Sequence, residues 1–119
     1  MLKLKFFLPF TLALLLISFL SSAQNERESI DSLFVQLEKA EEQDKIEILN
    51  TISRSYWNIS LDSSLYFANE ALSLAHIHED IKGIADSYNR IGNVYSFQGE
   101  SELALEYYNK CLKLRLEID

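Results

Sequence analysis

The stretch NRIGNVYSFQGESELALEYYNKCL, residues 89–112, decides the fold. It holds two small residues, Gly92 and Ala104, on either side of Gly99, and apolar residues recur through it at helical spacing. Two helices that cross closely cannot both carry large side chains at the contact. The spacing therefore predicts a helical hairpin in which Gly92 meets Ala104. The wider gaps of that hairpin are expected to be filled by three tyrosines, Tyr88, Tyr95 and Tyr108.

Helical periodicity extends over the rest of the chain after residue 23, where there is no proline. We expect an all-α fold of five helices at roughly 28–41, 44–59, 63–77, 81–97 and 101–117. Asp62 is expected to cap the third helix, and Gly99 to take a positive φ between the last two. Glu106 and Lys110 lie four residues apart and are expected to pair. Connections of a few residues make neighbouring helices antiparallel.

The last four expected helices contain one helical hairpin unit twice. The pattern Leu49-Asn50-x-Ile52-x-x-x-Tyr56 recurs 39 residues later as Tyr88-Asn89-x-Ile91-x-x-x-Tyr95. The pattern of the next helix recurs after 40 residues, so the second unit has one more loop residue. We therefore divide the chain into a signal segment, a leader helix, a first copy and a second copy, at 1–23, 24–44, 45–79 and 80–119.

The second copy resembles a tetratricopeptide repeat. The residues that carry the resemblance are Tyr88, Ile91, Gly92 and Tyr95 in its first helix and Ala104, Tyr108 and Cys111 in its second. Leu116 stands where the family has a closing proline, and in the first copy Ser53 and Ser64 replace the glycine and the alanine. The resemblance implies an α–α superhelix of stacked hairpins. The period near 40 is similar to that of a subset with extended helices, frequent in exported bacterial proteins and sensor regions.

The first 23 residues have the layout of a secretory signal peptide. Lys3 and Lys5 precede an apolar run at 6–20, and the small residues of 21–23 precede an expected cut before Gln24. A membrane span needs about 18–20 apolar residues, so this run is short for one. We expect export to the periplasm or the cell exterior, and an uncleaved membrane anchor is the alternative.

Charge and cysteine content narrow the classes of partner. Cleavage would leave 96 residues with 9 basic and 18 acidic side chains, a net charge of −9. A chain this acidic is repelled by phosphate backbones and by anionic lipids. We therefore expect no nucleic-acid partner, and membrane contact only if the signal segment stays uncleaved. Cys111 is the only cysteine, and its small-residue core position predicts a buried thiol.

The sequence shows no catalytic, cofactor or metal-binding set. His76 and His78 lie two residues apart, so on a helix they point to different sides and do not share a metal. The acidic pairs at 41–42 and 79–80 are expected to be solvated at helix ends rather than to converge in a pocket. We therefore expect a non-enzymatic protein without a cofactor.

A candidate peptide-binding groove lies on the first helices of the two copies, which line the concave face of stacked helical hairpins. The candidate residues are Asn50, Arg54, Trp57, Asn89, Asn93 and Phe97. Amides suit the backbone of an extended peptide, and aromatic rings suit its side chains. In peptide-clamping members of the family an asparagine often stands at the position of Asn93, where the first copy has Arg54. The alternative is that Trp57 and Phe97 pack against the adjacent repeat and the amides are only solvated.

We expect an exported interaction module whose partner is a protein or a peptide. The alternative is the N-terminal part of an envelope signalling protein, a histidine kinase or transcriptional regulator with a tetratricopeptide sensor region. The outer side of the last helix carries Leu105, Leu112 and Leu116, which are expected to lack cover. Further repeats or a second subunit would pack against that side.

Overall fold

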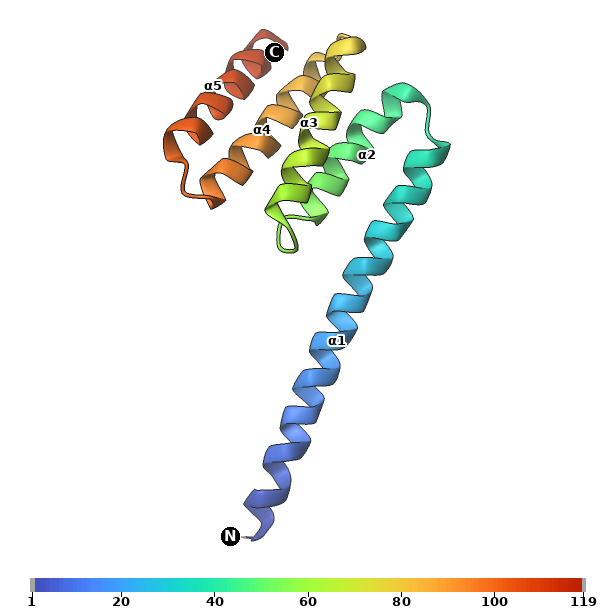
Figure 1. The fold of residues 1–119 in the computed structure, drawn as a ribbon, viewed down its shortest axis with the longest axis vertical. Helices are drawn as coiled ribbons and strands as arrows, with labels where there is room; N and C mark the ends of the chain where they lie inside the picture. The colour runs from blue at the N-terminus through green and yellow to red at the C-terminus, as the bar shows by residue number, and fades with distance from the viewer. Residues whose placement is uncertain (1, 119) are drawn as a thin grey trace. The chain divides into compact units, whose positions relative to one another are not determined.

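The computed structural model describes residues 2–118, and for residues 2–8 and Glu28 it describes the backbone alone. The side chains of Lys3 and Lys5, on which the signal-peptide prediction draws, lie outside the described part. The described residues form five α-helices and no strand (Figure 1), which confirms the all-α prediction. The helices are α1 Leu2–Lys39, α2 Glu42–Ser55, α3 Leu61–Ile77, α4 Ile81–Phe97 and α5 Ser101–Ile118.

The chain divides into two compact units, one up to Ser32 and one from Leu33 onward. Most of α1 makes up the first unit, so the expected start of the first helix near residue 28 is wrong. The apolar run has no periodic face by which sequence periodicity could mark a helix. Its leucines and alanines nevertheless favour helix, although Pro9 lies inside the helix and cannot donate a backbone hydrogen bond there.

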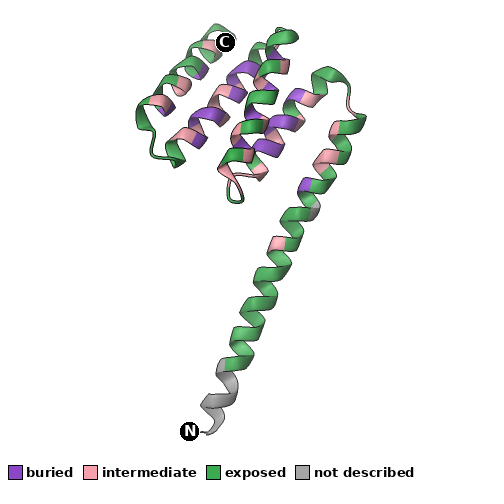
Figure 2. Ribbon diagram, viewed as in Figure 1, coloured by how far each residue is buried: buried purple, intermediate pink, exposed green. Residues whose placement is uncertain are grey.

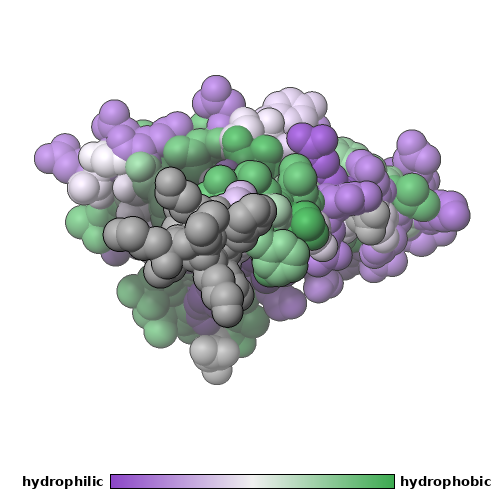
Figure 3. Space-filling model, turned by 90° about the horizontal axis from the view of Figure 1, so that it is seen from below, coloured by the Kyte–Doolittle hydropathy of each residue, from purple (hydrophilic) through white to green (hydrophobic). Residues whose placement is uncertain are grey.

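Over residues 9–20, where the side chains of α1 are described, the large apolar side chains are exposed: Phe10, Leu12, Leu14, Leu15, Leu16, Ile17, Phe19 and Leu20. Figure 3 shows hydrophobic residues, in green, on the surface that faces the viewer. Among the described residues, no helix offers an apolar stretch long enough to cross a bilayer.

The second unit is built from two antiparallel helical hairpins, α2 with α3 and α4 with α5 (Figure 1). Helix α4 packs against the other three, so its facing side is the most buried (Figure 2). Ile46, Ala75 and Ile84 form the buried centre where α2, α3 and α4 meet, with Tyr88 and Leu114 packed on it. Each isoleucine buried there stabilises the fold by about 1.5–3 kcal/mol.

The close crossing predicted between Gly92 and Ala104 is confirmed, and both residues are buried. A Cβ added to Gly92 would lie 2.8 Å from Tyr108 Cε1 and 3.3 Å from the Ala104 carbonyl oxygen. The Tyr108 hydroxyl donates a hydrogen bond of 2.7 Å to Asn93 Oδ1. The hairpin therefore depends on the absence of a side chain at residue 92.

A tyrosine that the sequence analysis did not single out completes this hairpin. The Tyr107 ring stacks on Tyr95, with centroids 5.6 Å apart, and also contacts Tyr88 at 5.9 Å. Tyr88 and Tyr95 are half-buried beneath it. The gaps around the crossing are thus filled by four tyrosines rather than three.

In the first hairpin, hydrogen bonds connect the two helices at the equivalent crossing. Ser53 and Ser64 stand where Gly92 and Ala104 stand in the second hairpin, and both are almost fully buried. Ser53 Oγ donates to the Ser64 carbonyl oxygen at 2.7 Å, and Ser64 Oγ donates to the Ser53 carbonyl oxygen at 2.8 Å. Each serine hydroxyl therefore has a hydrogen-bond acceptor on the other helix, so both side chains can be buried without an unpaired polar group.

Helices α3 and α4 end in the same way, although one has glycine at the end and the other does not. Gly99 has φ +81°, as predicted, and Glu79 has φ +52° at the equivalent place after α3. In both turns the N–H groups of this residue and of the next bond back to carbonyls of the last helical turn. Asp80 then begins α4, because its side chain accepts the Gly83 N–H at 3.0 Å.

Two predicted helix limits need correction. The second helix ends at Ser55 rather than near 59, because after the C-cap residue Tyr56 the N–H groups of Trp57 and Ile59 bond to carbonyls three residues back instead of four. The third helix begins at Leu61, since Ser60 and not Asp62 is its cap. Ser60 Oγ accepts the Ser63 N–H at 3.1 Å, and Asp62 instead lies in the first turn.

The last helix shows three predicted features. Lys110 Nζ and Glu106 Oε1 pair at 2.7 Å. Cys111 is buried, with 6% of its surface exposed. The outer leucines, Leu105, Leu112 and Leu116, are 59%, 56% and 69% exposed. Their counterparts in the first copy, Leu65 and Leu72, are half-buried, so the outer side of α5 is uncovered where α3 is covered.

Candidate functional site

The candidate groove residues lie along the interface between α2 and α4, which we call the α2–α4 interface. At one end, Ile46 lies so close to Gly83 that a Cβ on this glycine would be 2.7 Å from Ile46 Cγ2. At the other end, the Trp57 and Phe97 rings meet edge to face with centroids 4.7 Å apart. The two helices therefore run side by side and in the same direction over about three turns.

The middle of the interface is polar. Asn50 Nδ2 donates to Ser87 Oγ at 3.1 Å, and Ser87 Oγ itself donates to the Gly83 carbonyl oxygen at 2.8 Å. Because the Ser87 proton is used on Gly83, its oxygen must accept from the amide, which fixes the orientation of the Asn50 side chain. Asn50 Oδ1 is thereby left without a partner.

Two arginines lie between the polar contact and the aromatic contact. Arg54 follows Asn50 by one turn on α2, and Arg90 follows Ser87 by one turn on α4. The Arg54 side chain is exposed, whereas Arg90 is half-buried. Burial lowers the pKa of Arg90 most, and the nearby charge of Arg54 lowers it further.

The structure places the six candidate residues in different surroundings. Arg54 and Phe97 are exposed, and Phe97 keeps 62% of its surface in solvent. Asn93 is half-buried and accepts the Tyr108 hydroxyl, so its oxygen is occupied by α5. Asn89 is half-buried as well. Trp57 is half-buried against the ring of the adjacent repeat, as the alternative interpretation had it.

Asn50 departs from the prediction most clearly. It was expected on the groove surface, but only 7% of it is exposed, because its amide reaches across to Ser87 and lies inside the α2–α4 interface. Periodicity could not reveal this, since a partner helix from the next repeat covers a face that is free in a single hairpin.

Three buried polar side-chain atoms of the described residues have no hydrogen-bond partner in the protein, and all three lie on this interface. They are Asn50 Oδ1, Trp57 Nε1 and Arg90 Nε. One is an acceptor and two are donors. Leaving a buried polar group unpaired costs about 1–3 kcal/mol, so the interface favours a molecule that offers both acceptors and donors.

A pocket of about 250 Å³ adjoins this interface, near the start of α2 and α4. Its acidic lining residues are Asp44, Glu47, Asp80 and Asp86, with Lys82 beside them. Two of these carboxylates are already engaged, because Asp80 caps α4 and Asp86 Oδ1 accepts Arg115 Nη2 at 2.8 Å. Over the described residues, no group of three or more histidine, cysteine or acidic side chains could hold a metal ion.

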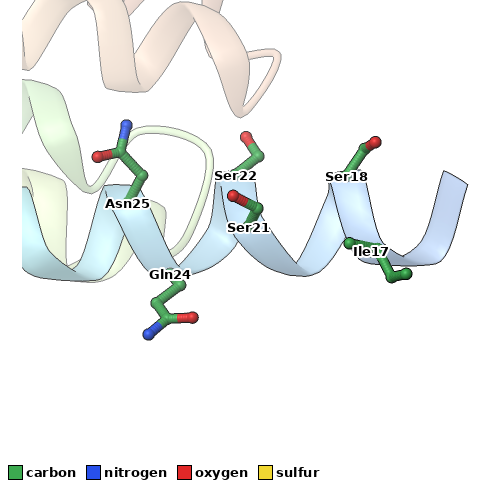
Figure 4. A pocket seen from close by; sticks show the side chains of 6 residues that line it. All are labelled: Ile17, Ser18, Ser21, Ser22, Gln24 and Asn25. Atoms are coloured by element: carbon green, nitrogen blue, oxygen red, sulfur yellow. The ribbon is translucent and has the colours of Figure 1, made fainter. Parts of the chain in front are cut away.

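A second hollow, of about 680 Å³, is lined by one helix, α1, with side chains on different sides of it (Figure 4). Its lining residues are Ile17, Ser18, Ser21, Ser22, Gln24 and Asn25. Hydroxyls and amides are present, but no acid, base or thiol, so the lining supplies no group for acid–base chemistry. The α2–α4 interface therefore remains the candidate site.

Comparison with known proteins agrees with the hairpin geometry. Residues 85–115 match the family model of the tetratricopeptide repeat, a span that covers most of α4 and α5. No curated protein and no solved structure gives a significant match to the chain. With Gly92 against Ala104 and the tyrosines around them, residues 85–115 of this chain form a repeat of the tetratricopeptide family.

Proposed function

We propose that this protein is an exported interaction module that binds an extended peptide segment of a partner protein along the α2–α4 interface. Tetratricopeptide repeats are protein–protein interaction modules, which sets the class of function. The proposal applies equally to the alternative in which these repeats are the sensor region of an envelope signalling protein.

The three unpartnered atoms of the interface carry the proposal. A peptide main chain presents N–H and C=O groups in alternation, so it can pair with Asn50 Oδ1, Trp57 Nε1 and Arg90 Nε once the side chains that bury these atoms move aside. The exposed ring of Phe97 lies beside them and offers apolar surface to a side chain of the same peptide.

A competing surface is the outer side of α5, where Leu105, Leu112 and Leu116 are exposed. It is apolar, but among the described residues none of the unpartnered polar atoms lies on it. A protein that packed there would bury leucines without relieving any polar group. The two surfaces therefore predict different sensitivities to substitution.

A matched pair of variants separates the two surfaces. Phe97→Ala and Leu112→Ala each remove one exposed apolar side chain from a helix, 62% and 56% exposed, so neither change should disturb the core. Random peptides displayed on phage are selected on the full chain and then tested for binding to each variant. We expect Phe97→Ala to weaken binding about tenfold and Leu112→Ala to leave it unchanged. The reverse pattern would move the site to α5 and refute the proposal.

Export is supported by the small residues before Gln24 and by the exposed apolar side chains of α1, which cleavage would remove. Mass spectrometry of the protein exported by a bacterial host should show an N-terminus at Gln24. Ala23→Phe places a large residue at the cut and should leave the full-length mass, whereas Asn25→Phe should still be cleaved. An exported wild-type protein that keeps residues 1–23 would instead support the membrane anchor.

A further inference from the structure

Two of the three arginines of residues 33–119, Arg54 and Arg90, lie at the α2–α4 interface, although the chain as a whole has a net charge of −7. Arg54 comes from α2, Arg90 from α4 and Arg115 from α5. Arg54 and Arg115 are both near enough to Arg90 for their charges to lower its pKa, after burial as the main cause. The other basic residues of 33–119 are all lysines and lie elsewhere in the sequence.

The cluster is short of negative charge. Asp86 is the acidic residue whose charge acts on Arg90, and its Oδ1 is already held by Arg115 at 2.8 Å. Neither Arg54 nor Arg90 forms an ion pair among the described residues. Like charges brought together without a counter-charge destabilise the fold, so binding an anion between the two arginines would be favourable.

We infer that the α2–α4 interface takes an acidic peptide segment, with an aspartate or glutamate side chain bound between Arg54 and Arg90 and an apolar side chain bound against Trp57 and Phe97. This inference rests on the proposed function and names the chemistry of its partner.

The chemistry of the groups supports a carboxylate. A guanidinium presents paired N–H donors that match the two oxygens of a carboxylate, and Arg90 Nε is an unpaired donor at this place. The short distance between Arg54 and Trp57 supports an apolar residue beside the acidic residue of the peptide. Arg54 lies in the last turn of α2, and Trp57 follows three residues later in the turn that ends this helix, where the Trp57 N–H bonds to the Arg54 carbonyl oxygen at 3.2 Å. The Cα atoms across such a turn are within about 7 Å of each other, which an extended peptide covers within about two residues. Acidic and apolar residues should therefore stand next to each other or two apart in the ligand.

A basic ligand has weaker support. The acidic pocket near the start of the two helices has Asp44 and Glu47 as its uncommitted carboxylates, and Lys82 reduces their charge. Two of the three unpartnered buried atoms are donors, which a cationic group cannot satisfy. The arginine cluster is also positive in a chain that is negative as a whole. A positive site of this kind attracts an anionic ligand that the rest of the chain would repel.

Peptide selection tests the inference without a known partner. Random peptides displayed on phage are selected on the full chain and on its Arg54→Glu variant. Wild type should enrich peptides with aspartate or glutamate beside an apolar residue. Arg54→Glu should lose that preference, whereas the control Lys113→Glu, which makes the same charge change at an exposed site on α5, should keep it. Circular dichroism confirms that each variant is folded.

Affinities of synthetic copies of the selected peptides then give the magnitude. Trp57 is the only tryptophan of the chain, so its fluorescence reports binding at the site itself. Arg54→Gln should weaken binding about tenfold or more, Arg54→Lys by less, and Lys113→Gln not at all. Raising the salt concentration should weaken wild-type binding. Peptides with amidated C-termini should bind as well as free acids, because the carboxylate comes from a side chain.

The outcomes separate this inference from the proposed function. Selected peptides that are neutral or basic, or that bind Arg54→Glu as well as wild type, would overturn the acidic partner while leaving peptide binding in place. Loss of binding on amidation would assign the carboxylate to a peptide C-terminus and overturn the side-chain assignment. A selection on wild type that enriches no peptide would overturn both the proposed function and the inference.

Discussion

The substitution Gly92→Ala tests the packing of the second hairpin. The new Cβ would stand 2.8 Å and 2.9 Å from two carbons of the Tyr108 ring, about 1 Å inside ordinary carbon contact. The ring cannot move away and keep the 2.7 Å hydrogen bond from its hydroxyl to Asn93 Oδ1. The Ala104 carbonyl oxygen, at 3.3 Å, limits movement of the backbone.

The magnitude follows from three contributions. Overpacking costs about 1–3 kcal/mol, and loss of the Tyr108 hydrogen bond costs about 1 kcal/mol. Alanine in a helix interior regains about 1 kcal/mol relative to glycine. The net loss is then about 2 kcal/mol. For a unit of about 90 residues this lowers the melting temperature by roughly 8–16 °C.

The assay is thermal unfolding followed by circular dichroism, in two backgrounds. In a Tyr108→Ala background the colliding ring is gone, so Gly92→Ala should become neutral or stabilising by up to about 1 kcal/mol, through helix propensity alone. This change of sign is the distinguishing result. If Gly92→Ala is tolerated in the wild-type background, or costs the same with and without the Tyr108 ring, the close-crossing argument is wrong.

Three further changes test other parts of the fold. Glu79→Gly should stabilise the protein by about 1 kcal/mol in urea unfolding, because glycine adopts φ +52° without the steric cost that glutamate bears; a loss of stability would contradict the strain. Ser53→Ala and Ser64→Ala should each cost about 1–2 kcal/mol, and a double-mutant cycle should show coupling between them, whereas additive effects would mean that the reciprocal bonds do not act together. The bond from Lys45 lowers the pKa of Glu42 below 4.5, so this pair stabilises the start of α2 above that pH and stops doing so as the pH falls through the lowered value; NMR titration of Lys45→Gln should find the Glu42 pKa raised, and an unchanged pKa would refute the pairing.

The sequence was sufficient for the architecture of the second unit because its constraints are local. Gly92 and Ala104 are small, evenly placed and flanked by aromatic residues, which leaves few ways to pack the two helices. Gly99 marks its turn by the same logic, since a positive φ selects glycine. These features depend on residues close in the chain, so a pattern in one sequence reveals them.

Features that neither a glycine nor an apolar period marks were not visible in the sequence. In the turn after α3, the residue at positive φ is Glu79 rather than a glycine, so the sequence does not mark the turn. The closing hydrogen bonds of the turn outweigh the strain at Glu79. In the sequence, Ser53 and Ser64 are seen only as departures from the repeat pattern. In the structure they bond to each other across two helices. The first half of α1 was not predicted to be helical, because a continuous apolar run shows no helical periodicity.

The peptide-binding groove stays a prediction. Of the residues named for it from the sequence, Arg54, Trp57 and Phe97 lie on or near the α2–α4 interface. The sequence did not show the burial of Asn50 or the presence of Arg90 beside Arg54. Both depend on residues 36 or 37 positions apart in the chain, Arg54 with Arg90 and Asn50 with Ser87. The periodicity of a single helix does not show how closely two such helices approach.

The reciprocal serine bonds give the two hairpins different mechanical properties. Two opposed bonds between Ser53 and Ser64 hold one helix at a fixed axial position against the other, so sliding by even a fraction of a turn breaks both in a waterless contact. At Gly92 and Ala104 the contact itself is apolar, and the hydrogen bond across that crossing, from the Tyr108 hydroxyl to Asn93 Oδ1, is a single one between longer, part-buried side chains, so a small axial displacement there costs less. A pulling force along the helices should therefore shear the hairpin nearer the C-terminus first and leave the other one in register.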